Sequence, residues 1–372
     1  MQNKEEYFSY FYGWWKNIDK SILFIVLSLF FLGLFFSLVS TSLIASNKLQ
    51  TNSYYFFIKH FIFVIIGLFC LFSFSILNHK QLYNLSRILF FIFFLLLALV
   101  PFIGVEVKGS KRWIDIFFLP RIQPIELLKP FLIIVISLAL TLGEHRNKYL
   151  SYILSLFVIC PVILFLIMQP DIGQSILILL TWLILIFISG INLFIFFSFF
   201  FILIGSTSYL IFFIPKFEYI KSRIFSFLDP SSGNNYQSEK ASEAIIGGGF
   251  FGKGVGEGTL NNRIPEAHTD YIVSVISEEF GIMIVIAIIL IFIFFAFQVI
   301  KKISIEKENK IKLILMGLIS LLILQTFVHI GVNIRILPTT GMTLPFLSYG
   351  GSSIISNSIL AGIILNLTRR KV

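Results

Sequence analysis

Glu126 and Lys129 lie three positions apart in an otherwise apolar run, and this spacing points to chemistry. They belong to the stretch QPIELLK of residues 123–129, and residues three apart share one face of a helix. Ionisable side chains inside an apolar segment are costly and usually face a bundle interior or a wet cavity, where they act on a substrate. A functional role is therefore favoured, and a mutual ion pair that only orients the helix is the alternative.

Further cations precede this pair. Lys111 and Arg112 belong to the segment KGSKRWI of residues 108–114. Several cations beside one cavity suit a phosphate or pyrophosphate, because arginine offers a planar fork and lysine a point charge. Together with Lys129, these residues predict a site for an anionic group.

A second polar group ends the longest hydrated stretch, residues 215–270. Glu266, His268 and Asp270 stand there, directly before an apolar run. Asp270 fits a helix N-cap, whose carboxylate accepts a backbone N–H. It fits a general base equally well, because acidic and imidazole neighbours can tune a carboxylate for that role. Position alone leaves both interpretations open.

A third group, PTTGMTLPFLSYGGSS at residues 338–353, includes Ser348 and Tyr349. Its prolines and glycines predict broken helix at membrane depth, which is tolerated only against protein or a wet cavity. Its hydroxyls either bind sugar or phosphate, or satisfy freed backbone groups. Asp171, Glu278 and Glu279 are secondary candidates.

The elements that must position these residues are transmembrane helices. The chain is 57% hydrophobic and 13% charged, with a mean hydropathy of +0.93. A run of about 20 apolar residues crosses a bilayer as a helix, whereas a barrel would alternate polar and apolar residues. We expect an all-α polytopic membrane protein, with one membrane domain over residues 1–372 and one long outward loop over 215–270. The ten expected spans are 22–44, 56–77, 87–104, 124–142, 150–168, 174–189, 191–214, 271–300, 313–333 and 351–367.

The net charge of +10 is explained by membrane topology. With the N-terminus in the cytoplasm, basic residues concentrate in the cytoplasmic segments, as the positive-inside tendency expects. Both chain ends are then cytoplasmic and the loop 215–270 faces outward. A nucleic-acid partner would need a basic surface outside the membrane, so the composition argues against one.

Two patterns that resemble cofactor sites are weak. Residues 247–252 fit G-x-G-x-x-G, but without a βαβ unit the pattern does not predict a nucleotide site. A flexible segment that folds over a lipid headgroup is the simpler interpretation. Cys70 and Cys160 fall inside apolar runs, which favours two buried thiols over a disulfide or metal pair.

Five segments occur in an order and spacing that resemble the SEDS family (shape, elongation, division and sporulation) of membrane glycosyltransferases. They are residues 108–114, 123–129, 169–173, 265–270 and 341–353, and the resemblance runs from about Trp14 to Arg370. Thr343, Trp14 and Trp15 favour the division branch of the family over the elongation branch. Ile125 departs from the family pattern, which usually has serine there.

This resemblance implies polymerisation of lipid II, an undecaprenyl-pyrophosphate-linked disaccharide-pentapeptide, on the outer face of the bacterial cytoplasmic membrane. Asp270 matches the essential loop aspartate of the family, and we hypothesise that it is the general base. Arg112, Glu126 and Lys129 match cavity residues associated with activity. Lys129, Arg112 and Lys111 would stabilise the charge on the leaving pyrophosphate, and Glu126 would orient Lys129. The further candidate substrate-binding residues are Glu266, His268, Ser348 and Tyr349.

The resemblance also implies partners. A class B penicillin-binding transpeptidase and other division proteins at the septum are expected, because polymerisation must be coupled to crosslinking. No cofactor is assigned; a divalent cation, Mg²⁺ or Mn²⁺, that bridges pyrophosphate and a carboxylate stays open. The alternatives are a lipid II flippase, an elongation polymerase and a passive scaffold.

Overall fold

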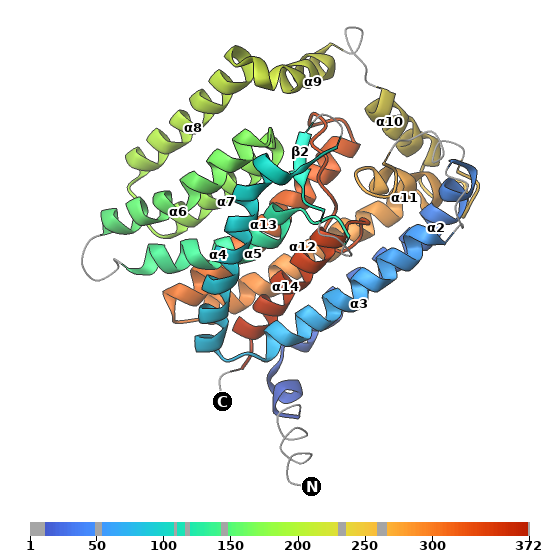
Figure 1. Cartoon of the computed structure of the whole chain (residues 1–372). Helices are drawn as coiled ribbons and strands as arrows, with labels where there is room; N and C mark the ends of the chain where they lie inside the picture. Colours follow the sequence, from blue (N-terminus) through green and yellow to red (C-terminus); the bar gives the residue numbers. More distant parts are fainter. Residues whose placement is uncertain are drawn as a thin grey trace.

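Ten apolar helices dominate the structure, a computed structural model that describes residues 12–48, 54–107, 110–115, 120–142, 148–229, 236–258 and 266–370 (Figure 1). Eight are long and apolar enough to cross a membrane, and two of 17 residues are shorter. The number of apolar helices agrees with the ten expected spans. The long helices are α2 (Lys20–Lys48), α3 (Tyr55–Ile76), α4 (His79–Ile103), α5 (Pro124–Leu142), α6 (Lys148–Met168), α8 (Leu193–Phe213), α12 (Ile282–Ile305) and α13 (Asn309–Asn333).

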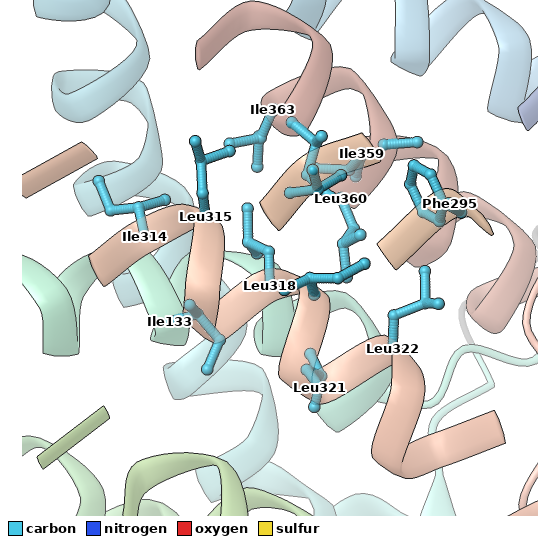
Figure 2. Packing of buried hydrophobic residues seen from close by; sticks show 14 of the residues in the cluster. Ile133, Phe295, Ile314, Leu315, Leu318, Leu321, Leu322, Ile359, Leu360 and Ile363 are labelled. Atoms are coloured by element: carbon cyan, nitrogen blue, oxygen red, sulfur yellow. The ribbon is translucent and has the colours of Figure 1, made fainter. Parts of the chain in front are cut away.

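The two short helices, α7 (Ile172–Ile188) and α14 (Gly351–Leu367), lie in the interior of the bundle. Figure 2 shows Ile359, Leu360 and Ile363 of α14 beside Leu315 and Leu318 of α13. The α3–α14 contact is closer still, since a Cβ on Gly362 would lie 2.6 Å from the Leu71 carbonyl oxygen. Because lipid is as apolar as these side chains, close packing rather than hydrophobic burial holds such helices together.

Two expected spans were wrong in their boundaries, and one of them is α4, which begins at His79 rather than at residue 87. The predicted span 271–300 is two helices, α11 (Ile272–Phe280) and α12, separated by Gly281 with a φ of 83°. This left-handed conformation ends α11 and is readily adopted only by glycine. The polar stretch before it contains a 3₁₀ turn (Pro215–Phe217), α9 (Glu218–Leu228) and α10 (Tyr236–Gly248).

A small β-hairpin interrupts the otherwise helical structure. Strands β1 (Val105–Val107) and β2 (Ser110–Trp113) pair antiparallel, with Glu106 opposite Lys111. Figure 1 shows β2 at the end of the bundle over which α9 and α10 lie. The opposite end carries the Asp19–Lys302 ion pair of 2.6 Å and a hydrogen bond from the Arg370 N–H to the Asn17 carbonyl.

The expectation of two buried thiols was wrong for Cys160. This residue is exposed on α6, and Cys70 on α3 is partly exposed. Both are free cysteines within apolar helices, so their surroundings are apolar without being enclosed by protein.

The glycine-rich segment at the end of α10 is tightly packed, contrary to the expected flexible segment. A Cβ on Gly248, Gly252 or Gly281 would collide with a facing backbone carbonyl. The Lys253 N–H donates to the Glu278 carbonyl at 2.9 Å, and the Ile282 N–H donates to the Gly249 carbonyl at 3.0 Å. These glycines therefore bring two backbones into contact and lock α10 onto the α11–α12 junction.

We predict that Gly281→Ala lowers the free energy of unfolding by about 2–4 kcal/mol, because the substitution combines a positive φ with a steric clash. Gly205→Ala in α8 is the control, since a Cβ there meets nothing within 4 Å. Thermal unfolding of both purified variants checks this. Equal melting temperatures would contradict the packing role of Gly281.

Candidate functional site

The buried ion pair at the start of α5 is the centre of the site. The Lys129 Nζ lies 2.9 Å from both Glu126 carboxylate oxygens, and the residues are 2% and 4% exposed. Pro124 begins the helix and Glu126 stands in its first turn, where the helix dipole favours a negative charge. The i, i+3 spacing thus produces the shared helix face that the sequence predicted.

Amide side chains from two other helices bond to this pair. Gln174 of α7 donates through Nε2 to the Glu126 Oε1 at 2.7 Å. Lys129 donates to the Gln325 Oε1 of α13 at 2.8 Å, and the Gln325 Nε2 donates to the Thr343 carbonyl at 3.0 Å. A hydroxyl from α14, Ser356 Oγ, donates to the Glu126 carbonyl at 2.6 Å. The pair therefore connects four helices and reaches the segment after α13.

Arg112 extends this network towards the surface. Its guanidinium lies 3.6 Å from the Asp171 carboxylate and donates to the Pro170 carbonyl at 2.5 Å. Asp171 caps α7, accepting from the Gln174 N–H at 3.4 Å. The Arg112 side chain stays 19% exposed. Asp171, a secondary candidate from the sequence, is therefore the link between Arg112 and the buried pair.

Lys111 does not join this network in the part of the chain that the structure describes. It is exposed, whereas Arg112 is partly buried. Successive residues of a strand point to opposite faces, so the β2 strand that turns Arg112 inward turns Lys111 outward. Its neighbour Lys108 lies outside the described residues, as do Arg263 and Pro265.

Asp270 lies at the end of a tight turn and is partly buried. The Glu266 carbonyl accepts the N–H groups of Thr269 and Asp270 at 3.0 Å each, and Glu266 has a φ of 59°. The N-cap of α11 is Tyr271 rather than Asp270, so the N-cap interpretation of Asp270 was wrong. The carboxylate lies beside Gly341, where a Cβ would stand 3.6 Å from Oδ2.

The segment 334–350 holds the Asp270 turn in place. Ser348 Oγ donates to the Thr269 carbonyl at 2.7 Å, and the Tyr349 N–H donates to the His268 carbonyl at 3.0 Å. The Asn333 Nδ2 of α13 donates to the Asp270 carbonyl at 3.0 Å. Ser348 is 2% exposed. Its hydroxyl therefore bonds to the backbone of the turn, one of the two roles that the sequence left open, and a contact with substrate stays a prediction.

The remaining candidates of this turn make local contacts. The His268 ring packs against Phe56 at 4.8 Å and Tyr349 at 5.7 Å between centroids. The Glu266 carboxylate accepts from the Thr269 hydroxyl at 3.1 Å. His268, Glu266 and Tyr349 are all partly buried and lie within the same turn region as Asp270.

The charge of Asp270 affects its neighbour. Burial and the adjacent Asp270 carboxylate raise the pKa of Tyr271 to about 12, while the Arg223 guanidinium acts in the opposite direction. Asp270, Tyr271 and Arg223 therefore share one electrostatic environment at this end of the bundle.

Sequence reasoning passed over Gln325 and Asn333. Both are amides in the apolar helix α13, where polar side chains usually bond to neighbouring helices. That placement was a usable signal. Glu278 lies outside the network, since Lys253 pairs with it at 2.8 Å. Among the described residues, no group of three or more His, Cys, Asp or Glu could hold a metal ion.

Known proteins resemble this chain in sequence. Residues 20–372 match the FtsW/RodA/SpoVE family, described as "Cell cycle protein". A Caulobacter vibrioides protein named "Probable peptidoglycan glycosyltransferase FtsW" is 30% identical over 368 residues, which cover 96% of this chain and 91% of the relative. A Wigglesworthia glossinidia brevipalpis protein of the same name is 34% identical over 366 residues, with coverage of 96% and 93%.

A solved structure also resembles this chain in its fold. It is described as "Structural coordination of polymerization and crosslinking by a peptidoglycan synthase complex", and one of its chains aligns with a TM-score of 0.76 and 25% identity. The alignment covers 94% of this chain and 97% of that chain.

We predict that breaking the buried pair destabilises the protein more than removing it. Lys129→Met leaves a buried carboxylate without its cation, which costs about 3–5 kcal/mol. The double variant Glu126→Gln with Lys129→Met should recover part of that loss, because no unpaired charge remains. Thermal unfolding of the single and double variants checks this. A double variant less stable than Lys129→Met alone would contradict it.

Proposed function

This chain belongs to the FtsW/RodA/SpoVE family of cell cycle proteins and is a peptidoglycan glycosyltransferase, and we propose that it polymerises lipid II into β-1,4-linked glycan strands. The observation that carries this proposal is the position of Asp270. A partly exposed carboxylate lies one short segment, Gly341 to Thr343, away from a network that contains Arg112 and Lys129.

The chemistry follows from the charges. Formation of a β bond from an α-linked pyrophosphate requires inversion, so the acceptor hydroxyl must attack the anomeric carbon opposite the leaving group. In the proposed step, Asp270 takes the proton of the 4-hydroxyl as general base. The new C–O bond forms, the bond to the pyrophosphate breaks, and the pyrophosphate leaves with the electron pair.

Arg112 is the cation best placed to contact the leaving pyrophosphate, because its guanidinium is partly exposed. Lys129 is enclosed by Glu126 and Gln325, so we assign it to positioning: it stabilises the network that holds Asp171 and the segment through Thr343. Preorganised groups of this kind stabilise developing charge without reorganising during the reaction. A Mg²⁺ or Mn²⁺ ion, if used, would arrive with the pyrophosphate.

The wider setting completes the proposal. The protein is a multi-pass membrane protein, and the solved relative belongs to a complex that coordinates polymerisation and crosslinking. We propose cytoplasmic chain ends, an outward-facing site at the division septum and a class B penicillin-binding transpeptidase as partner. The positive-inside distribution and the names of the relatives support this arrangement.

We predict that Asp270→Asn lowers polymer formation from lipid II at least about 100-fold, because an amide cannot take the proton. Glu257→Gln is the matched control: it makes the same change at an exposed carboxylate of the preceding loop. Glycan strands are resolved on a gel after incubation with the transpeptidase partner. Undiminished polymer from Asp270→Asn would exclude the base role, and a wild type that only moves labelled lipid II across liposomes would establish the flippase instead.

The double variant Glu126→Gln with Lys129→Met tests whether the buried pair contributes to catalysis or only orients α5. If the buried pair only orients α5, the folded double variant keeps full polymerase activity. We expect the polymerisation rate to fall at least about tenfold. Without the charged side chains, Gln174 and Gln325 lose the hydrogen bonds that hold them in place, and the site loses its alignment. The measurement is the initial polymerisation rate at saturating lipid II.

A further inference from the structure

A polar cavity lies beside the segment that follows α13, and Leu337, Pro338 and Thr339 line it. Its volume is about 650 Å³, and it lies between α9, the first turn of α10 and the residues that follow α13. Arg223 and Arg335 supply its charge, and Ser222 and Gln237 are among its polar wall. None of the described residues that line it is acidic. The lining chemistry therefore suits an anionic ligand.

Arg335 occupies a backbone position that favours glycine. Its φ is 57°, and the N–H groups of Ile336 and Leu337 both donate to the Gly331 carbonyl, at 2.8 and 3.0 Å. Such a left-handed residue directly after a helix is usually glycine, which has no Cβ to strain. Within the described residues, the Arg335 guanidinium has no hydrogen-bond or ion-pair partner of its own. A strained arginine at a cavity wall is a reason to infer function.

Arg223 places the cavity next to Asp270. Its guanidinium donates to the Thr339 carbonyl at 3.1 Å, and Thr339 lines the cavity. Two residues further on, Gly341 approaches the Asp270 carboxylate. The same segment then reaches the buried pair through Thr343 and Gln325. Along this segment, the contact with Asp270 therefore falls between the contact with Arg223 and the contact with the buried pair.

We propose that the Arg223–Arg335 cavity is a second anion subsite, which binds an oxyanion of a lipid-linked sugar substrate. The identity of the ligand rests on the proposed function. Polymerisation joins a donor and an acceptor that both carry anionic groups, and two anions at one cationic centre repel each other. A separate pair of guanidiniums, Arg223 and Arg335, solves this problem. The oxyanion is either the pyrophosphate or a carboxylate of the attached peptide.

The test measures equilibrium binding of fluorescent lipid II, and of an analogue without its peptide, to the full chain in nanodiscs. Arg335→Gly removes the guanidinium and suits the φ of 57°, so the variant should fold. We expect its dissociation constant for lipid II to rise about tenfold, the usual effect of losing one charge-assisted bond. Arg223→Gln should weaken binding in the same direction.

Lys221→Ala is the matched control, because it removes the same charge from α9 without lining the cavity. Loss of affinity for lipid II alone identifies the peptide carboxylate as the bound group, and equal loss for both ligands identifies the pyrophosphate. Unchanged affinity in Arg335→Gly and Arg223→Gln, or an equal loss in Lys221→Ala, overturns the subsite. A wild type that binds lipid II but makes no polymer refutes the proposed function and leaves the binding result valid.

Discussion

A buried charge pair needs polar partners inside an apolar bundle, and the Glu126–Lys129 pair imposes this requirement on the fold. Each ion leaves water at a cost of several kcal/mol, which is offset only when good geometry and additional hydrogen bonds accompany the pairing. Gln174 of α7 and Gln325 of α13 provide those bonds, and Ser356 of α14 donates to the backbone carbonyl of Glu126. The relative positions of α5, α7, α13 and α14 are therefore tied to the geometry of a single ion pair.

The irregular backbone after α13 is stabilised by the same kind of bonding. At membrane depth a broken helix leaves N–H and carbonyl groups that only protein or enclosed water can satisfy. Gln325 donates to the Thr343 carbonyl, His329 Nδ1 lies 2.7 Å from the Met342 carbonyl, and Ser348 Oγ accepts the Leu344 N–H at 2.9 Å. Side chains thus fix the shape of this segment, and it in turn fixes the turn that carries Asp270.

This coupling explains how a peptidoglycan glycosyltransferase can use a membrane interior. The interior supplies rigidity, because Lys129 pairs with Glu126 there and side chains bond to the irregular backbone after α13. The groups that we propose to act on the substrate, Arg112 and Asp270, lie at the edge and remain partly exposed. The Asp270 carboxylate and the Arg112 guanidinium are both accessible there, whereas the residues that position them are buried.

Hydropathy and helical spacing are local properties, so the number of apolar helices and most of their positions could be predicted from the residues alone. The expected spans 124–142 and 351–367 coincide with α5 and α14, and the shared face of Glu126 and Lys129 follows from helix geometry. Tertiary structure alone decided which residues meet across the bundle. The hairpin separates Arg112 from Lys111, Gly281 divides one expected span in two, and amides of remote helices complete the ion pair. Such contacts depend on how elements far apart in the chain pack together, which no local pattern encodes.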